Sequence, residues 1–224
     1  MKEVNIVGAT GMVGREVTRQ LLEDPGIDKV RIFVRRKSGL SHPRLEEHIV
    51  DFDHPENWGA LVTGDALFSA LGTTLKQAGS KEAQYRVDFT HNYQFAEAAA
   101  RNGVATYVLV SAAGANARSL IFYSRMKGEL DEQVQKLPFR HIHILRPSIL
   151  TGQREVRRPA EEWSATFMEK IGRVMFRSYR PISAATVARA MINAALLINV
   201  PRISVFKPGE LFNLAALNQQ TETQ

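Results

Sequence analysis

The chain of 224 residues contains no cysteine. This excludes disulfide bonds and thiolate metal sites, and it favours a reducing compartment such as the cytoplasm. The sequence also lacks any apolar run near the roughly 18 residues that a membrane-spanning helix needs, and it begins without the basic and apolar regions of a signal peptide. We therefore expect a soluble cytoplasmic protein that has no membrane partner.

Patterns typical of metal and nucleic-acid sites are missing as well. The six histidines show no metal-ligand spacing, and packing explains His141 and His143, which share one face of a strand, so we expect no metal. The net charge of +6 comes from scattered basic residues without the interleaved aromatic residues that stack on bases, so we expect no nucleic-acid partner. A looser basic group within 154–180 is either a solvated surface or a contact for an anion.

What the chain does have is a glycine-spaced turn close to its start. The apolar run 4–7 leads into Gly8-x-x-Gly11-x-x-Gly14, and helical periodicity follows. Gly8 allows the positive φ of a tight turn, Gly11 allows the backbone to approach a pyrophosphate, and Gly14 allows close packing of helix on strand. A purely structural turn is the alternative. The pattern favours a dinucleotide-binding loop, made of Gly8, Thr10, Gly11, Met12, Val13 and Gly14.

Strand and helix patterns alternate along the chain. Strands are expected at 4–7, 29–34, 49–50, 66–70, 106–110, 141–145 and 203–206. Helices are expected at about 12–22, at 80–102 with Ser80 as cap and Gly103 as stop, at 119–136, around Trp163 to Val174, and at 184–197 with Ser183 as cap. This alternation predicts an α/β fold, a doubly wound parallel sheet with helices on both faces. We expect one domain over 1–217, with 153–182 as a substrate-side insertion in a small C-terminal lobe and 218–224 as a flexible tail.

The residues after the second strand predict which dinucleotide binds. In NAD sites an acidic residue about twenty positions beyond the loop holds the ribose 2′-hydroxyl, but this chain has Arg35 and Arg36 there. Guanidinium groups bind a 2′-phosphate, so the sequence favours NADP(H) over NAD(H), with Arg15 as a further contact; solvation of a strand end is the alternative. Asp51 is a candidate contact for the adenine amino group. The small residues after the fourth strand, expected to line the dinucleotide, are Ala70, Leu71, Gly72 and Thr73.

Three side chains form a candidate catalytic set. Ser111 follows the strand 106–110, and Tyr123 and Lys127 share one face of a helix because they lie four residues apart. A free tyrosine, with a pKa near 10, is ionised in about one part in a thousand at neutral pH, and a nearby ammonium favours the anion. The set predicts hydride transfer in which Tyr123 exchanges the proton, Ser111 hydrogen-bonds the carbonyl oxygen and Lys127 holds the cofactor ribose. Taken alone, such a Tyr-Lys pair is common on exposed helices without any role.

Together, Gly8-Ala-Thr-Gly-x-x-Gly14, Ser111 and Tyr123-x-x-x-Lys127 resemble the short-chain dehydrogenase/reductase superfamily in its atypical or extended branch. Ser69-Ala-Leu-Gly-Thr-Thr74, Lys127-Gly-Glu129 and Leu145-Arg-Pro-Ser148 resemble in particular the group around the HIV Tat-interactive protein and small bacterial relatives labelled as nucleotide-sugar epimerases. The resemblance implies a Rossmann fold, NADP(H) at the glycine loop and a Ser-Tyr-Lys set. A frequent fourth member is an asparagine in the long helix, where Asn92 lies outside a recognisable motif.

Three functions remain open on the sequence. The first is an NADP(H)-dependent oxidoreductase acting on a small carbonyl or alcohol substrate, and the second is a redox-sensing or regulatory protein that binds NADP(H) without turnover. The third, an epimerase or dehydratase for nucleotide sugars, is disfavoured because only about seventy residues follow Gly152. The oligomeric state is open, with a homo-oligomer as one outcome.

Overall fold

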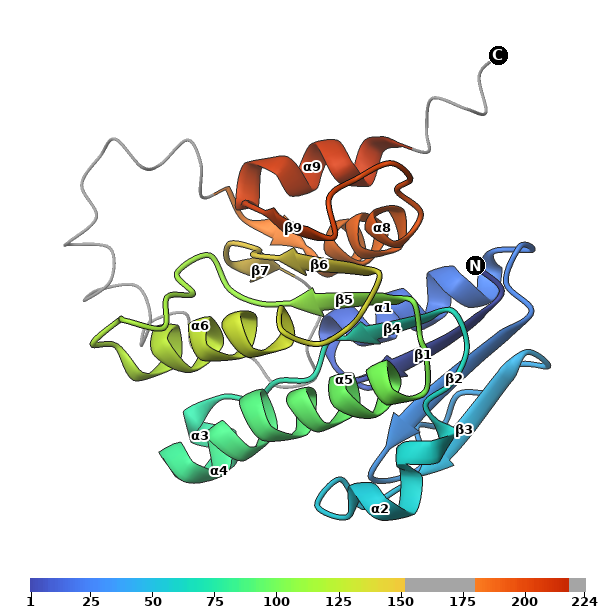
Figure 1. Cartoon of the computed structure of the whole chain (residues 1–224), viewed down its shortest axis with the longest axis horizontal. Coiled ribbons are helices and arrows are strands. Elements are labelled where there is room, and N and C mark those ends of the chain that lie inside the picture. Colours follow the sequence, from blue (N-terminus) through green and yellow to red (C-terminus); the bar gives the residue numbers. More distant parts are fainter. Residues whose placement is uncertain (152–179, 218–224) are drawn as a thin grey trace.

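A seven-stranded parallel sheet forms the centre of the protein (Figure 1). The computed structural model describes residues 1–151 and 180–217. The strands run in the order β3-β2-β1-β4-β5-β6-β9, and every neighbouring pair is parallel. They are β1 (Glu3–Val7), β2 (Lys29–Val34), β3 (Leu45–Ile49), β4 (Ala66–Ser69), β5 (Thr106–Val110), β6 (His141–Leu145) and β9 (Ile203–Phe206). The strand order reverses between β1 and β4, which confirms the predicted doubly wound α/β fold.

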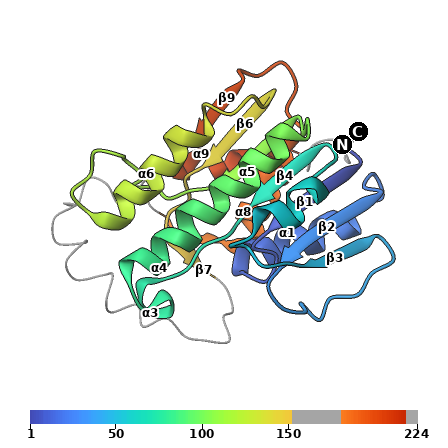
Figure 2. The same ribbon diagram turned by 60° about the horizontal axis from the view of Figure 1, so that its bottom comes forward.

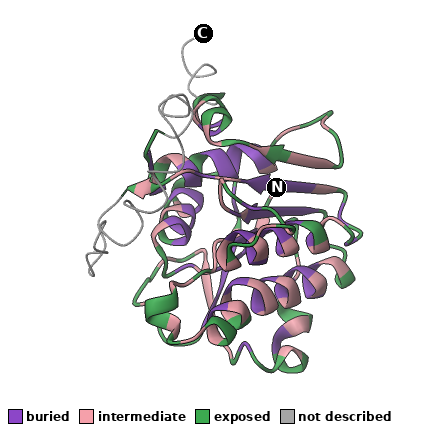
Figure 3. Cartoon of the chain, turned by 90° about the vertical axis from the view of Figure 1, so that its left-hand side faces the viewer, coloured by how far each residue is buried: buried purple, intermediate pink, exposed green. Residues whose placement is uncertain are grey.

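Helices cover both faces of this sheet (Figures 1 and 2). One apolar core lies between the sheet and α1 (Met12–Glu23), α8 (Ala184–Ala195) and α9 (Pro208–Ala216). The other lies between the sheet and α2 (Pro55–Trp58), α5 (Asn92–Arg101) and α6 (Phe122–Val134). Figure 3 shows the central strands largely buried, since parallel strands with crossover helices on both faces have no solvated side.

Several short elements complete the described residues. They are α3 (Leu75–Ala78), α4 (Lys81–Tyr85), a 3-10 turn (Gly59–Leu61), a π-helical turn (Arg86–His91) and two short strands, β7 (Leu150–Thr151) and β8 (Ile182–Ser183). β7 and β8 pair in parallel as a separate two-stranded sheet. β9 is the last strand of the main sheet, so the described residues near the C-terminus extend that sheet.

The predicted helix over 80–102 is present with both of its expected ends. The Ser80 hydroxyl accepts a hydrogen bond from the Ala83 N–H at 3.1 Å, and Gly103 has a φ of +78°. The sequence did not predict the π-helical turn Arg86–His91 between α4 and α5. Such a turn inserts one residue into the helical repeat and is often found beside functional sites.

The other predicted helices differ from the structure in detail. The helix expected at 119–136 is shorter, because the Ser119 hydroxyl accepts from the Ile121 N–H in the preceding turn and α6 begins only at Phe122. Ser183 caps α8 as predicted, with its hydroxyl accepting from the Thr186 N–H at 3.0 Å. The expected helix around Trp163 to Val174, most of the insertion 153–182 and the tail 218–224 lie outside the described residues.

His143 on β6 makes the stability of this fold depend on pH. Its side chain is 1% exposed, and neither ring nitrogen has a hydrogen-bond partner in the described part of the chain. Burial, and to a smaller extent His141, lower the pKa of His143 from 6.5 to about 4. The unfolded chain therefore takes up this proton at a higher pH than the native state does, so stability falls as the pH drops below 6.5 and levels off below 4.

Replacing His143 with leucine should remove this pH dependence. At pH 4.5 the wild type should have lost about 2–3 kcal/mol of unfolding free energy through this histidine relative to pH 7.5, and His143→Leu should not show that loss. Urea unfolding of both proteins at the two pH values measures the difference. Equal losses in the two proteins would show that another group causes the acid sensitivity.

Candidate active site

The glycine turn between β1 and α1 is closely packed. Gly8 has a φ of +84°, and a Cβ there would lie 2.5 Å from the carbonyl carbon of Ala70. A Cβ on Gly14 would lie 2.1 Å from the Gly8 oxygen, whereas one on Gly11 would meet the same oxygen at 3.2 Å. The roles predicted for Gly8 and Gly14, a tight turn and close helix packing, match this geometry. The turn brings the start of α1 against the residues that follow β4.

The start of α1 is suited to an anion. Gly11 is the N-cap residue and provides no side-chain cap, and the first turn of the helix has no acidic residue. Thr10 and Gly11 are exposed, while the side chains of Met12 and Val13 pack against the core beneath α1. Uncapped N–H groups at a helix start bind phosphate oxygens, so these residues fit a dinucleotide pyrophosphate through their backbone.

Polar side chains from the long helix hold the segment after β4. The Thr73 N–H donates to Asp88 Oδ2 at 2.7 Å, and Asn92 Nδ2 donates to the Leu71 oxygen at 3.2 Å. The Ser69 hydroxyl donates to Asn92 Oδ1. Asp88 and Asn92 are both buried. Asp88 and Asn92 thus fix the backbone of residues 70–73, which are predicted to line the cofactor. The sequence analysis did not assign this role to Asp88, although an acidic residue within an otherwise packed helix could have indicated it.

The predicted contacts for the adenosine end lie at the same edge of the sheet. Arg35 and Arg36 follow β2 and are exposed, and Asp51 follows β3 and is also exposed. The Asp51 carboxylate accepts from the Asp53 N–H at 3.0 Å, and the Asp51 carbonyl accepts from Trp58 Nε1 at 2.8 Å. Carboxyl ends of parallel strands share one edge, so these residues lie on the side of the glycine turn.

Lys127 reaches the end of β5, where Ser111 follows the strand. Lys127 Nζ donates to the Val110 oxygen at 3.2 Å, and both residues are buried, with Ser111 5% and Lys127 3% exposed. Tyr123 lies one helical turn before Lys127 and is half-buried. The structure therefore places a hydroxyl and an ammonium together at the carboxyl edge of the sheet, with Tyr123 on the same helix.

Gly128, directly after Lys127, allows a close contact that the sequence did not indicate. A Cβ on Gly128 would lie 2.1 Å from the Ala117 nitrogen. The loop that follows Ser111 thus rests on α6, where the Asn116 N–H donates to the Ser124 oxygen at 2.9 Å. This contact sets the position of the loop relative to the helix turn that carries the predicted tyrosine and lysine.

Two further polar residues near Ser111 were missed by the sequence reasoning. Asp131 on α6 is 1% exposed, and its Oδ2 accepts from Arg146 Nε at 3.0 Å and Nη2 at 2.9 Å. Burial raises the pKa of the Asp131 carboxyl, while the Ser111 hydroxyl and the cations Arg146 and Lys127 act in the opposite direction. Fifteen residues separate this acid from its arginine, so no local spacing could have signalled the pair.

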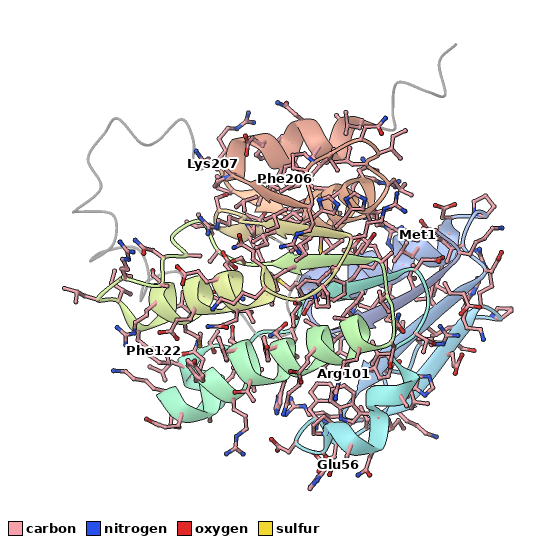
Figure 4. The ribbon with its side chains drawn as sticks, in the orientation of Figure 1. Met1, Glu56, Arg101, Phe122, Phe206 and Lys207 are labelled. Carbon is pink, nitrogen blue, oxygen red and sulfur yellow. The ribbon has the colours of Figure 1, made fainter. Side chains whose placement is uncertain are left out.

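Two hollows on the described surface lie away from these residues. One is beside α2 and α5 and is lined by residues that include Glu56 and Arg101, which Figure 4 labels. The other lies among α1, α8 and α9. Neither is lined by a residue of the predicted catalytic or cofactor site. Among residues 1–151 and 180–217 no group of three or more metal-binding side chains is arranged to hold a metal ion.

A glycine turn leading into a helix at the centre of a doubly wound sheet defines the class of NAD(P)-binding Rossmann proteins. The chain matches the family model described as NAD(P)H-binding over residues 8–196 and belongs to that family. This membership supports a nicotinamide dinucleotide as the cofactor and agrees with the resemblance to atypical short-chain dehydrogenases/reductases.

The chain is similar over most of its length to curated fungal proteins. It is 37% identical over 205 residues to "Protein fmp52, mitochondrial" of Aspergillus fumigatus, and the match covers 88% of each chain. It is 34% identical over 197 residues to "Protein FMP52-1, mitochondrial" of Scheffersomyces stipitis, with 85% of this chain and 86% of the relative covered. These names contradict our expectation of a cytoplasmic location, which was wrong because a lack of cysteine indicates reducing conditions and not one compartment. No helix in the described ranges is long and apolar enough to cross a membrane.

Solved structures share the fold at low sequence identity. UDP-glucose 4-epimerase of Thermotoga maritima, solved with UDP-glucose, aligns with a TM-score of 0.67 and 14% identity, covering 99% of this chain and 84% of that one. The enzyme WbmH of Bordetella bronchiseptica, solved with NAD+, aligns with a TM-score of 0.70 and 18% identity, covering 93% and 76%. At these identities the likeness shows a common Rossmann architecture.

Proposed function

We propose that this protein is an NADP(H)-dependent oxidoreductase of the short-chain dehydrogenase/reductase type that interconverts a small carbonyl compound and its alcohol. The observation that carries the proposal is the buried Lys127 ammonium, 3.2 Å from the Val110 oxygen and next to Ser111, on the helix face that also bears Tyr123. The family membership and the glycine turn on the same sheet edge support a nicotinamide cofactor beside this set.

Each member of the set has a defined task in reduction. The chemistry that NADPH would supply when bound is the hydride, and the Tyr123 hydroxyl would donate a proton to the oxygen of the substrate as the alcohol forms. The Ser111 hydroxyl hydrogen-bonds that oxygen and stabilises its developing negative charge. The Lys127 ammonium stabilises the tyrosinate that remains and has further donors for the ribose hydroxyls.

The cofactor residues fall into three groups. The backbone of Gly8, Thr10, Gly11, Met12, Val13 and Gly14 binds the pyrophosphate at the start of α1. Ala70, Leu71, Gly72 and Thr73 line the dinucleotide, and Asp88 and Asn92 hold the backbone of this segment. Asp51 accepts from the adenine amino group, and Arg35 and Arg36 bind the 2′-phosphate.

Replacing Arg35 and Arg36 with alanine should remove the preference for NADPH. Hydrogen bonds to charged groups contribute about 1.5–3 kcal/mol, so the Kd for NADPH should rise about 10- to 100-fold while the Kd for NADH changes little. Titration of cofactor fluorescence measures both constants. Arg101→Ala, which removes an exposed arginine from the last turn of α5, is the matched control and should bind both cofactors as the wild type does. An undiminished NADPH preference in Arg35→Ala/Arg36→Ala would assign the phosphate to other residues.

Turnover itself is tested with NADPH and a panel of aldehydes and ketones. Consumption of NADPH, followed by the loss of its absorbance, is the expected result for at least one substrate of the panel. Tight NADPH binding without consumption in the presence of any of these compounds would instead support a protein that senses or stores the cofactor. In a separate incubation with a nucleotide sugar, a product with one inverted stereocentre would support an epimerase.

A further inference from the structure

Asp131 is a buried acid that the proposed mechanism does not use. It lies on α6 one helical turn after Lys127, so both side chains emerge from the same face of the helix. Only 1% of its side chain is exposed. A buried carboxylate is stable only when positive charges and hydrogen-bond donors surround it, so its partners indicate what it does.

The partners of Asp131 come from the ends of two strands. Arg146, directly after β6, donates to Oδ2 through Nε and Nη2 at 3.0 and 2.9 Å, and its own N–H is fixed by the Phe206 oxygen at 2.9 Å. Lys127 and the Ser111 hydroxyl also lie close enough to stabilise the carboxylate. Asp131 Oδ1 and Ser111 Oγ complete no hydrogen bond of ordinary geometry among the described residues. The carboxyl therefore lies between α6 and the end of the sheet.

Asp131 offsets part of the positive charge of Lys127 and Arg146. Both side chains are cations, and Lys127, which is 3% exposed, donates a hydrogen bond to the neutral Val110 oxygen. Without the carboxylate, the buried Lys127 ammonium would lose a nearby negative charge, and α6 would lose its only ion pair to the end of β6 among the described residues. The turn of α6 that bears Tyr123 and Lys127 would then be free to shift.

We propose that Asp131 is a positioning residue of the active site, which balances the Lys127 ammonium and, through Arg146, fixes α6 against the carboxyl ends of β5 and β6. It contacts neither substrate nor cofactor in this scheme. The inference rests on the proposed oxidoreductase function for its kinetic part, while its electrostatic part is independent of turnover.

The kinetic test uses the isosteric variant Asp131→Asn. Its kcat with NADPH and a carbonyl substrate should fall about 10- to 100-fold, because a small displacement of the reacting groups has effects of that size, while the Kd for NADPH stays within about threefold. Glu129→Gln is the matched control: it also changes an acid to its amide on α6, but on the half-exposed side facing Arg125 and Tyr85, and it should keep the wild-type kcat. An unchanged kcat in Asp131→Asn would overturn the proposal.

The electrostatic test needs no activity. The carboxyl carbon of Asp131 is titrated by NMR in the wild type and in Lys127→Met, with Arg125→Met as a control that removes an exposed cation from the same helix. Loss of Lys127 should raise the pKa of Asp131, and loss of Arg125 should leave it unchanged. An identical titration in Lys127→Met would overturn the proposal, whatever the activity. If the shift is seen but the wild type reduces no carbonyl compound, the proposed function fails while the link between Asp131 and Lys127 stands.

Discussion

Replacing Tyr123 with phenylalanine should reduce the NADPH-dependent turnover of a carbonyl substrate by about 10²- to 10⁴-fold, the contribution expected of a positioned acid or base. The ring and its packing on α6 remain, and only the hydroxyl that carries the transferred proton is lost. The pyrophosphate and the 2′-phosphate bind elsewhere, and the loss of one neutral hydrogen bond has a small effect on affinity. The Kd for NADPH should therefore change less than about threefold. Stopped-flow absorbance and fluorescence titration measure the two quantities.

The control for this variant is Tyr93→Phe. Tyr93 is a half-buried tyrosine on α5 whose ring stacks beside Phe89, so its substitution removes a phenol hydroxyl and keeps the aromatic packing. This variant should retain the wild-type kcat. Full turnover in Tyr123→Phe would contradict the assignment of Tyr123 as the proton donor. Ser111 or a bound water would then be the candidate donor.

The second large effect is expected from Gly14→Ala. Helix propensity alone predicts that alanine stabilises α1 by about 1 kcal/mol. The new Cβ would, however, lie 2.1 Å from the Gly8 oxygen and 2.7 Å from the Gly8 carbon, and both are backbone atoms that cannot rotate away. Overpacking costs about 1–3 kcal/mol or more, so the contact outweighs the propensity. We expect the helix start to move away from the glycine turn, with a net loss of stability and a loss of NADPH binding.

Gly209→Ala is the matched control for this substitution. Gly209 is also a helical glycine, near the start of α9, and apart from its chain neighbours and the backbone of its own helix no atom lies within 4 Å of the Cβ that alanine would add. Its unfolding free energy should change by less than about 1 kcal/mol and its cofactor affinity should not change. Thermal unfolding with and without NADPH distinguishes the variants. Wild-type binding by Gly14→Ala would show that the pyrophosphate does not depend on this contact.

Most of the fold could be predicted from periodicity and turn chemistry. Largely buried parallel strands such as 29–34 and 106–110 are rich in apolar and β-branched residues, and the end signals Ser80 and Ser183 act through bonds to residues nearby in the chain. The start of α6 was placed three residues too early, because Ser119 has the composition of a helix cap but bonds to the turn before the helix. The π-helical turn had no local signal at all.

The candidate site divides in the same way. Gly8, Gly14, Ser111, Tyr123 and Lys127 could be selected because each stands at a fixed spacing within one element or at a strand end. The residues that hold these five in place could not be selected from the sequence. Asp131 meets Arg146 across fifteen positions, Asp88 meets Thr73 across fifteen, and Gly128 touches a loop eleven residues earlier. Their partners become neighbours only when helix and sheet pack together.

The sequence by itself determined the doubly wound sheet, the glycine turn and the place of a hydroxyl, a phenol and an ammonium along the chain, because these depend on interactions within a few residues. Only the tertiary structure decided that Lys127 is buried beside Ser111 and that a buried acid stands between two cations there. Burial and charge balance depend on every element that packs around a group, and in this protein those elements are α6 and the ends of β5 and β6. Local spacing therefore predicted which side chains react, and the packing of these elements determined the burial and the charges around them.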